Sequence, residues 1–301
     1  MIDDKTTSAV RALARMGSFR AASEAVGTSP ASFSRYIAQA EEYAGQTLFE
    51  RGGRHTILTS AGREFMVLLD KLDVATRMFE AGVGRLTETG PEMLNIGCGP
   101  LTTRAIISPI LADMLEAHPD MRARVMVSAS KAPLEALRMG QLDVAVCDLT
   151  HTPDLSDLEI QVLRKEPVSF WAHPAHPIFE QSQVSVKDVF RSPFMTAHLH
   201  KHWRAAVANV LGGDEEAWQI VSSLPQIESD DFGFICDLAC RTNLICGGMA
   251  ADFAEHAALG RLKQVQTKET MTWNICGARR KTASFPILDQ FWERLRDQFG
   301  T

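Results

Sequence analysis

The chain has 301 residues, of which 45% are hydrophobic and 23% charged, and its formal net charge at pH 7 is −6. This length is enough for two or three compact domains, and the net charge excludes a protein that is basic over its whole surface. Residues 1–63 nevertheless carry 8 Lys and Arg against 6 Asp and Glu, whereas the remainder carries 23 against 31. A slightly basic head on an acidic body predicts DNA contact at one end, with dimerisation supplying the affinity.

Two further composition features bear on compartment and chemistry. No run of about 18 apolar residues and no signal peptide occurs, so we expect a cytoplasmic protein that does not enter a membrane. The six cysteines stand in apolar contexts without a CxxC motif, which favours buried free thiols. Cys236 and Cys240 share one helical face, so a redox or metal-sensing pair stays open as an alternative.

Residues 9–26 predict two short helices. Val10, Leu13 and Ala14 recur at helical spacing, Gly17 ends the run, and Ser18 can cap a second helix. That second helix carries alanines at 21, 22 and 25, whose small side chains allow the close helix contact of a helix-turn-helix.

The segment 29–45 predicts the helix that reads DNA. Ser29 and Pro30 form a strong helix start, and Gly45 a helix end. Phe33, Ile37, Ala40 and Ala44 form one apolar stripe, while the opposite face carries small or hydroxyl side chains around one cation. Such a face can approach a groove and bond to phosphates or base edges. The predicted DNA contacts on this helix are Ser29, Pro30, Ala31, Ser32, Ser34 and Arg35.

Two short strands follow, at 48–51 and 56–59, around a basic tip. This hairpin predicts a β-wing whose Arg51, Arg54 and His55 reach phosphate or an adjacent minor groove.

Four motifs in one register, GSFRAA, TSPASFSRYI, LFER and LTSAG, resemble the winged helix-turn-helix of LysR-type transcriptional regulators. Val26, Thr28 and Ala40 depart from the family's usual larger residues, which should loosen the domain slightly. The resemblance continues through LEALRMGQLDVAVC and His176-Pro177, and so spans nearly the whole chain. It implies a multidomain α+β fold: an N-terminal winged helix-turn-helix, a long linker helix, and a C-terminal α/β effector domain of two periplasmic-binding-protein-like subdomains.

Residues 60 to about 81 predict a helix on the order of 33 Å long. Phe65, Leu68, Leu72, Ala75 and Phe79 form its apolar stripe, which needs a partner helix. Packing onto its own domain is the alternative, and the resemblance favours a dimerising linker. Glycines at 82, 84 and 90 and Pro91 then predict a hinge.

From Met93 onward, strands alternate with helices and predict a parallel α/β sheet. We expect strands at 93–98, 123–128, 142–147, 168–172, 194–197, 219–223, 244–246 and 271–277, and helices at 103–117, 134–139, 202–211, 231–241, 250–257 and 286–299. The expected domains are 1–62 for DNA binding, 63–90 for the linker, and 91–301 for the effector. Within the last, subdomain 1 spans 91–164 and 267–301 and subdomain 2 spans 165–266.

Loops after strands predict the ligand site, because ligands of open α/β sheets lie beyond the strands' carboxyl ends. The resemblance places such loops in the effector cleft. The candidate contacts are Leu101, Thr102, Thr103, Ser130, His198, Leu199 and His200. Hydroxyls and helix N-termini favour a small organic anion, although each hydroxyl could equally be a helix cap.

No cofactor, metal site or catalytic residue is expected. The histidines near 198–202 lack a carboxylate or thiol at ligand spacing, and no G-x-S-x-G, phosphate loop or HExxH occurs. The predicted protein is a regulator, not an enzyme, whose partners are promoter DNA, a small-molecule effector, further copies in a homodimer or homotetramer, and possible RNA polymerase. The alternative is a small-molecule-binding α/β protein or enzyme whose N-terminal helices mediate protein interaction.

Overall fold

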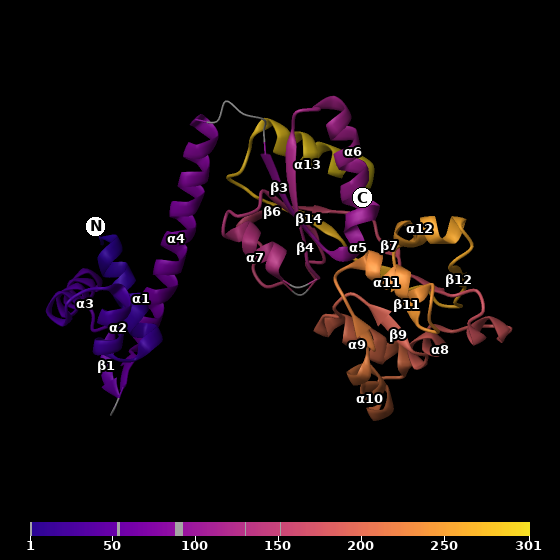
Figure 1. The fold of residues 1–301 in the computed structure, drawn as a ribbon, viewed down its shortest axis with the longest axis horizontal. Coiled ribbons are helices and arrows are strands. Elements are labelled where there is room, and N and C mark those ends of the chain that lie inside the picture. Colours follow the sequence, from indigo (N-terminus) through magenta and orange to yellow (C-terminus); the bar gives the residue numbers. More distant parts are fainter. Residues whose placement is uncertain (1, 53–54, 88–92, 130, 151) are drawn as a thin grey trace. The chain divides into compact units, whose positions relative to one another are not determined.

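The computed structural model describes residues 2–52, 55–87, 93–129, 131–150 and 152–301. They fall into two compact units, Met1–Gly84 and Arg85–Thr301. The mixture of helices and sheets in Figure 1 confirms the predicted fold class. Arg54, Ser130 and the hinge residues Gly90 and Pro91 lie outside the described residues.

The first unit contains three helices, a hairpin and a long helix: α1 Asp4–Met16, α2 Phe19–Val26, α3 Pro30–Ala44, β1 Phe49–Gly52, β2 His55–Leu58 and α4 Ser60–Thr87. The predicted start and end residues are confirmed. Ser18 caps α2, Ser29 caps α3, and Gly17 and Gly45 end α1 and α3 at positive φ. The apolar stripe of α3 packs into a core with α1. Of the three alanines on α2, however, Ala22 is buried while Ala21 and Ala25 are exposed.

The hairpin is fixed to the helices by polar contacts. Oε1 of Glu41, near the end of α3, accepts hydrogen bonds from the Leu48 and Phe49 amides at 2.8 and 3.2 Å. The Thr56 amide donates to the Gly17 carbonyl at 2.8 Å. These bonds hold β1 and β2 as a wing against the helix-turn-helix.

Helix α4 is longer than predicted, because it continues through Gly82 and Gly84 to Thr87. A glycine costs a helix interior only about 1 kcal/mol, so two of them do not end it. Phe65 and Leu69 are buried against the first unit, and Arg11 of α1 forms ion pairs with Asp70 and Asp73. The rest of the predicted stripe is exposed.

The first lobe of the second unit is a five-stranded sheet in the order β4-β3-β5-β14-β6. Its strands are β3 Met93–Cys98, β4 Arg122–Val127, β5 Val144–Cys147, β6 Leu158–Val162 and β14 Cys276–Arg280. Its helices are α5 Pro100–Thr102, α6 Ser108–Ala117, α7 Ala132–Arg138 and α13 Pro286–Phe299. Figure 1 shows α6 and α13 on one face of the sheet and α7 on the other.

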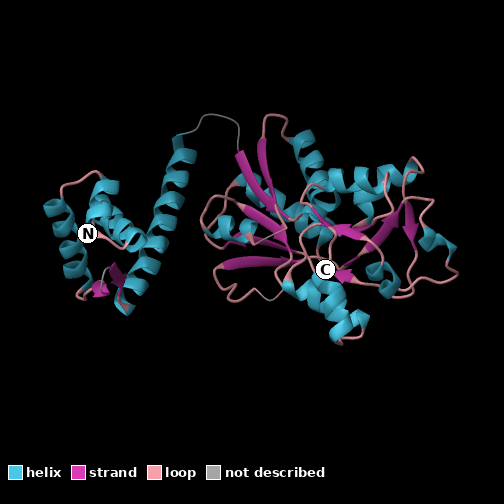
Figure 2. Cartoon of the chain, turned by 60° about the horizontal axis from the view of Figure 1, so that its bottom comes forward, coloured by secondary structure: helices cyan, strands magenta, loops and turns pink. Residues whose placement is uncertain are grey.

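The second lobe is another five-stranded sheet, in the order β10-β9-β11-β8-β12, and Figure 2 shows helices flanking its strands. Its strands are β8 Ser169–Ala172, β9 Phe194–Thr196, β10 Ile227–Glu228, β11 Ile245–Gly248 and β12 Lys263–Val265. Its helices are the 3₁₀ turn Pro177–Glu180, α8 Val186–Arg191, α9 Lys201–Leu211, α10 Glu215–Ser223, α11 Phe232–Ala239 and α12 Ala250–Ala258.

The chain crosses between the lobes twice. The crossings pass through β7 Glu166–Pro167 and β13 Thr272–Trp273, which pair antiparallel. A continuous apolar core also joins the lobes: Leu101 of the first lobe lies against Phe232 and Gly248 of the second. Among the described residues, no helix is long and apolar enough to cross a bilayer.

Three predictions for this unit are wrong. The sheets are mixed rather than parallel, because β14, β8 and β12 run antiparallel to their neighbours. Residues 219–223 belong to a helix, since Asp214 caps α10 and its apolar residues Ala217 and Val221 lie four apart on the buried face. The expected strand at 271–277 is divided into β13 and β14, which lie in different sheets. The expected helix at 103–117 is present, but it starts with a π-helical turn, Thr103–Ile107, just before Pro109, which has no amide to donate to the preceding turn.

Candidate functional sites

The outer face of α3 is free of the protein's own core. Ala31, Ser34, Arg35 and Ala38 are all exposed, while Phe33 and Ile37 on the other side are buried. The Arg35 guanidinium lies 6.0 Å from the Tyr36 ring centre. This face therefore offers small side chains, a hydroxyl and a cation to an incoming groove.

The start of α3 is capped. The Ser29 hydroxyl accepts a hydrogen bond from the Ser32 amide at 3.2 Å and lies 3.0 Å from the Ser32 hydroxyl. Pro30 occupies the first helical position. On the wing, His55 is exposed opposite Gly52, and Arg51 lies in β1. The predicted DNA contacts within the described residues thus gather on α3 and the wing of one unit.

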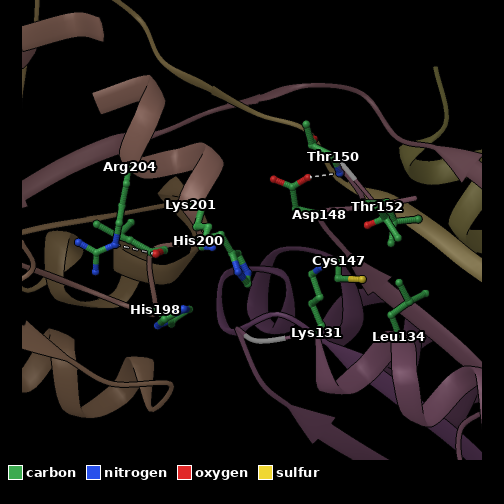
Figure 3. Close-up of a pocket in the computed structure, with 12 residues that line it drawn as sticks. Lys131, Leu134, Cys147, Asp148, Thr150, Thr152, His198, His200, Lys201 and Arg204 are labelled. Atoms are coloured by element: carbon green, nitrogen blue, oxygen red, sulfur yellow. Dashed lines mark hydrogen bonds between the residues drawn. The ribbon is translucent and has the colours of Figure 1, made fainter. Parts of the chain in front are cut away.

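A cavity of about 720 Å³ lies between the two lobes of the second unit (Figure 3), a size typical of small-molecule sites. The first lobe supplies Lys131, Leu134, Cys147, Asp148, Leu149, Thr150 and Thr152, and the second supplies His198, Leu199, His200, Lys201 and Arg204. Three predicted ligand contacts, those at 198–200, therefore come together at one wall. This wall is the loop between β9 and the start of α9.

The polar groups of the cavity are partly occupied. Asp148 accepts hydrogen bonds from the Thr150 amide at 2.7 Å and from the Trp203 indole at 3.3 Å. His198 Nδ1 lies 2.9 Å from the Glu228 carboxylate. The Arg204 guanidinium donates to the carbonyls of Leu199, Val221 and Leu224. Arg204 thus braces the wall while leaving its positive charge without a described carboxylate partner.

Cys147 also lines this cavity, and its thiol is neutral at pH 7. Burial, and secondly the Asp148 charge, raise the pKa of Cys147 to about 12. The side chain therefore acts as a small apolar surface rather than as a thiolate.

The other predicted ligand contacts lie beside this cavity. Leu101 and Thr102 line a smaller adjoining pocket, and both are nearly fully buried. The Thr102 hydroxyl donates to the carbonyls of Gly99 at 2.8 Å and Val146 at 3.2 Å. Thr103 lines a separate cavity of about 440 Å³ with Arg104, and its hydroxyl donates to the Gly99 carbonyl. The capping alternative accounts for these hydroxyls, and their ligand roles stay predictions.

Sequence reasoning missed several residues of the cavity. Lys131 and Asp148 follow the rule used for the other loops, since each lies just beyond a strand of the first sheet. Lys201 begins α9, and Arg204 lies one turn further on. Trp203 packs on Trp273 of β13, with ring centres 4.4 Å apart. No sequence motif connects these last positions, because the fold alone brings them together.

All six cysteines are free. Cys98, Cys236 and Cys246 are buried, and the other three are half-buried. Cys240 Sγ lies 3.4 Å from Nδ1 of His256, and burial raises the pKa of Cys240. Among the described residues, no three metal-ligating side chains form a site.

Comparisons with known proteins add a family to this geometry. The family described as LysR substrate binding domain matches residues 89–300. The family described as bacterial regulatory helix-turn-helix protein, lysR family, matches residues 6–63.

Named relatives match over most of their length. The SDS degradation transcriptional activation protein of a Pseudomonas strain is 27% identical over 253 residues, 83% of this chain and 80% of that protein. The transcriptional activator IlvY of Salmonella typhimurium is 24% identical over 301 residues, 94% and 96% of the two chains.

Solved structures share the fold. ArgP from Mycobacterium tuberculosis aligns with a TM-score of 0.56 at 15% identity, covering 99% of this chain and 97% of that one. A full-length OxyR variant from Pseudomonas aeruginosa aligns with a TM-score of 0.54 at 16% identity, covering 98% and 95%.

Proposed function

Because the chain belongs to the LysR family of transcriptional regulators, with a DNA-binding helix-turn-helix and an effector-binding domain, we propose that α3 and the wing bind promoter DNA while the cavity between the lobes binds an anionic effector. The exposed face around Arg35 carries the first part of this proposal. Its charge and small neighbours suit a major groove. Ser29, Pro30, Ala31, Ser32 and Ser34 would lie along the groove, and Arg51, Arg54 and His55 would reach the backbone or an adjacent minor groove.

The domain division that we propose follows from these roles. Residues 1–62 bind DNA, 63–90 link and dimerise, and 91–301 bind the effector, with subdomain 1 at 91–164 and 267–301 and subdomain 2 at 165–266. The active species would be a homodimer or homotetramer in the cytoplasm, and contact with RNA polymerase would follow DNA binding. Family membership favours this regulator over the alternative of an enzyme with an N-terminal interaction module.

Effector control would act through closure of the two lobes. A ligand that contacts both walls of the cavity binds a closed arrangement more tightly than an open one, and so shifts the population toward it. The change would pass to the linker helices and alter the spacing or bend of the bound DNA sites.

The test is binding to the intergenic DNA upstream of the protein's own gene, measured by fluorescence anisotropy at several salt concentrations. Arg35→Ala should weaken binding by about 1–3 kcal/mol if the guanidinium contacts a base. Lys71→Ala on α4 removes one exposed positive charge from the same unit, and serves as the control. Equal affinity of both variants, or binding that does not weaken with salt, would count against this DNA surface.

A further inference from the structure

The cavity between the lobes holds more positive than negative charge. Its lining includes Lys131, Lys201 and Arg204 but one carboxylate, Asp148. That carboxylate already accepts two hydrogen bonds from the protein. The Glu228 carboxylate is not part of the lining and lies 2.9 Å from Nδ1 of His198. A ligand that balances these charges carries more than one negative charge.

The two lysines are available to such a ligand. Within the part of the chain that the structure describes, neither Lys131 nor Lys201 forms an ion pair or a side-chain hydrogen bond, and both are exposed. An exposed lysine beside a cavity is a flexible point charge that can follow a ligand's acid group. These side chains are therefore the parts of the cavity that can respond to an anion.

The two lysines come from opposite lobes. Lys131 precedes α7 of the first lobe, and Lys201 begins α9 of the second. Figure 3 shows Lys131 reaching in from one side, and the segment that carries His200 and Lys201 on the other. On the side of the first lobe, the lining also includes an apolar surface formed by buried Leu134 and Leu149 with the neutral Cys147 thiol. This surface suits a short carbon chain rather than a further charge.

We propose that the effector is a short-chain dicarboxylate, whose two carboxylates bind Lys131 of the first lobe and Lys201 of the second. The proposal rests on the proposed function, in which this cavity is the effector site. One acid group for each lobe also explains how a small ligand would hold the lobes closed, because a monoacid would engage a single wall. A single phosphate would lack the carbon chain that the apolar surface accommodates.

Calorimetric titration of the full chain tests this assignment. The probes are succinate and adipate, with butyrate and hexanoate as the monocarboxylates of the same lengths, and inorganic phosphate. At least one dicarboxylate should bind roughly tenfold tighter than its monocarboxylate, the difference that one charge-assisted contact provides. Lys131→Met and Lys201→Met should each lower dicarboxylate affinity about tenfold and reduce the preference over the monocarboxylate. Lys268→Met, an exposed lysine after β12, should change neither.

Four results would overturn the proposal: no saturable binding of any dicarboxylate, equal affinity for matched mono- and dicarboxylates, unchanged affinity in both lysine variants, or binding of phosphate alone. Operator binding by the same preparations separates this proposal from the proposed function. If DNA binding is intact but no dicarboxylate binds, the dicarboxylate proposal is wrong and the proposed DNA-binding function stands. If dicarboxylates bind but DNA does not, the proposed DNA-binding surface is wrong instead.

Discussion

At the scale of single residues, Asp252 has an unusual environment. It is fully buried in α12, and one carboxylate oxygen accepts a hydrogen bond from the Met249 amide at 3.1 Å. The other oxygen has no hydrogen-bond partner among the described residues. Burial raises the pKa of Asp252 to about 7, although the Met249 amide and the Arg104 charge act in the opposite direction. At a pH between the ordinary aspartate pKa and about 7, the Asp252 carboxyl therefore stays protonated in the folded protein, whereas it is ionised in the unfolded chain.

This burial makes stability depend on pH. Between the ordinary aspartate pKa and about 7, the folded state binds more protons than the unfolded state, so the free energy of unfolding falls as pH rises. Asp252→Asn cannot lose a proton, and at pH 8 it should be more stable than the wild type by up to roughly 4 kcal/mol. At pH 4 the gain should vanish. Urea unfolding at both values, with the exposed Glu255→Gln as control, measures it. A gain that is the same at both pH values would contradict this account.

Gly62 makes a close contact that excludes a larger residue. A Cβ there would lie 2.1 Å from the Leu48 carbonyl oxygen and 2.9 Å from the Leu58 side chain. Gly62→Ala should therefore destabilise the first unit by about 3 kcal/mol, since the helix and the wing must separate. Gly82→Ala in the same helix meets nothing within 4 Å and should stabilise by about 0.5–1 kcal/mol. Thermal unfolding followed by circular dichroism compares the two, and equal effects would refute the steric explanation.

At the scale of elements, the far part of α4 carries exposed apolar side chains. Leu68, Leu72 and Phe79 are 46–72% exposed and lie four and seven residues apart. A stripe of this spacing buries itself against a second helix. The exposed stripe therefore supports dimerisation through α4.

Charging this stripe should break the proposed dimer. Phe79→Asp places a carboxylate where an apolar side chain would be buried, and should weaken self-association at least tenfold. Sedimentation equilibrium of the full chain measures the dissociation constant. Glu80→Ala, on the neighbouring exposed position, should leave it unchanged. A Phe79 variant that associates as tightly as the wild type would exclude α4 from the interface.

Local signals predicted most elements. Strand β3 and helix α13 begin and end where the sequence indicated. For β3 the signal is an apolar run that Gly99 ends, and for α13 it is Pro286 at the first helical position. Prediction failed where tertiary contacts decide. The β-rich run in α10 folds as a helix since Asp214 caps it, and β6 pairs with a strand more than 100 residues away. The cavity loops follow from the strand-end rule, whereas Lys201 and Arg204 depend on how α9 meets the first lobe.

At the scale of the whole molecule, the two lobes of the second unit are joined by a contact that a ligand can alter. The Trp203 indole of the second lobe donates to Asp148 of the first at 3.3 Å and packs on Trp273 of the crossing strand. Asp148 also lines the cavity. Movement of the lobes should therefore change the surroundings of both indoles.

Tryptophan fluorescence should report this movement. A ligand that fills the cavity should shift the emission of the wild type, and Trp203→Phe should remove most of the shift. Trp218→Phe, on an exposed position of α10, should preserve it. A shift that survives in the Trp203 variant would mean that the lobes do not move at this contact.

The position of β14 has a consequence for synthesis. This strand, residues Cys276–Arg280, lies between β5 and β6, so the first lobe lacks an inner strand until nearly the whole polypeptide has left the ribosome. The winged head belongs to a compact unit formed by the first 84 residues, and so can fold much earlier. A nascent protein would thus acquire its DNA-binding part before it can bind an effector. A prematurely released fragment would then bind DNA without responding to an effector.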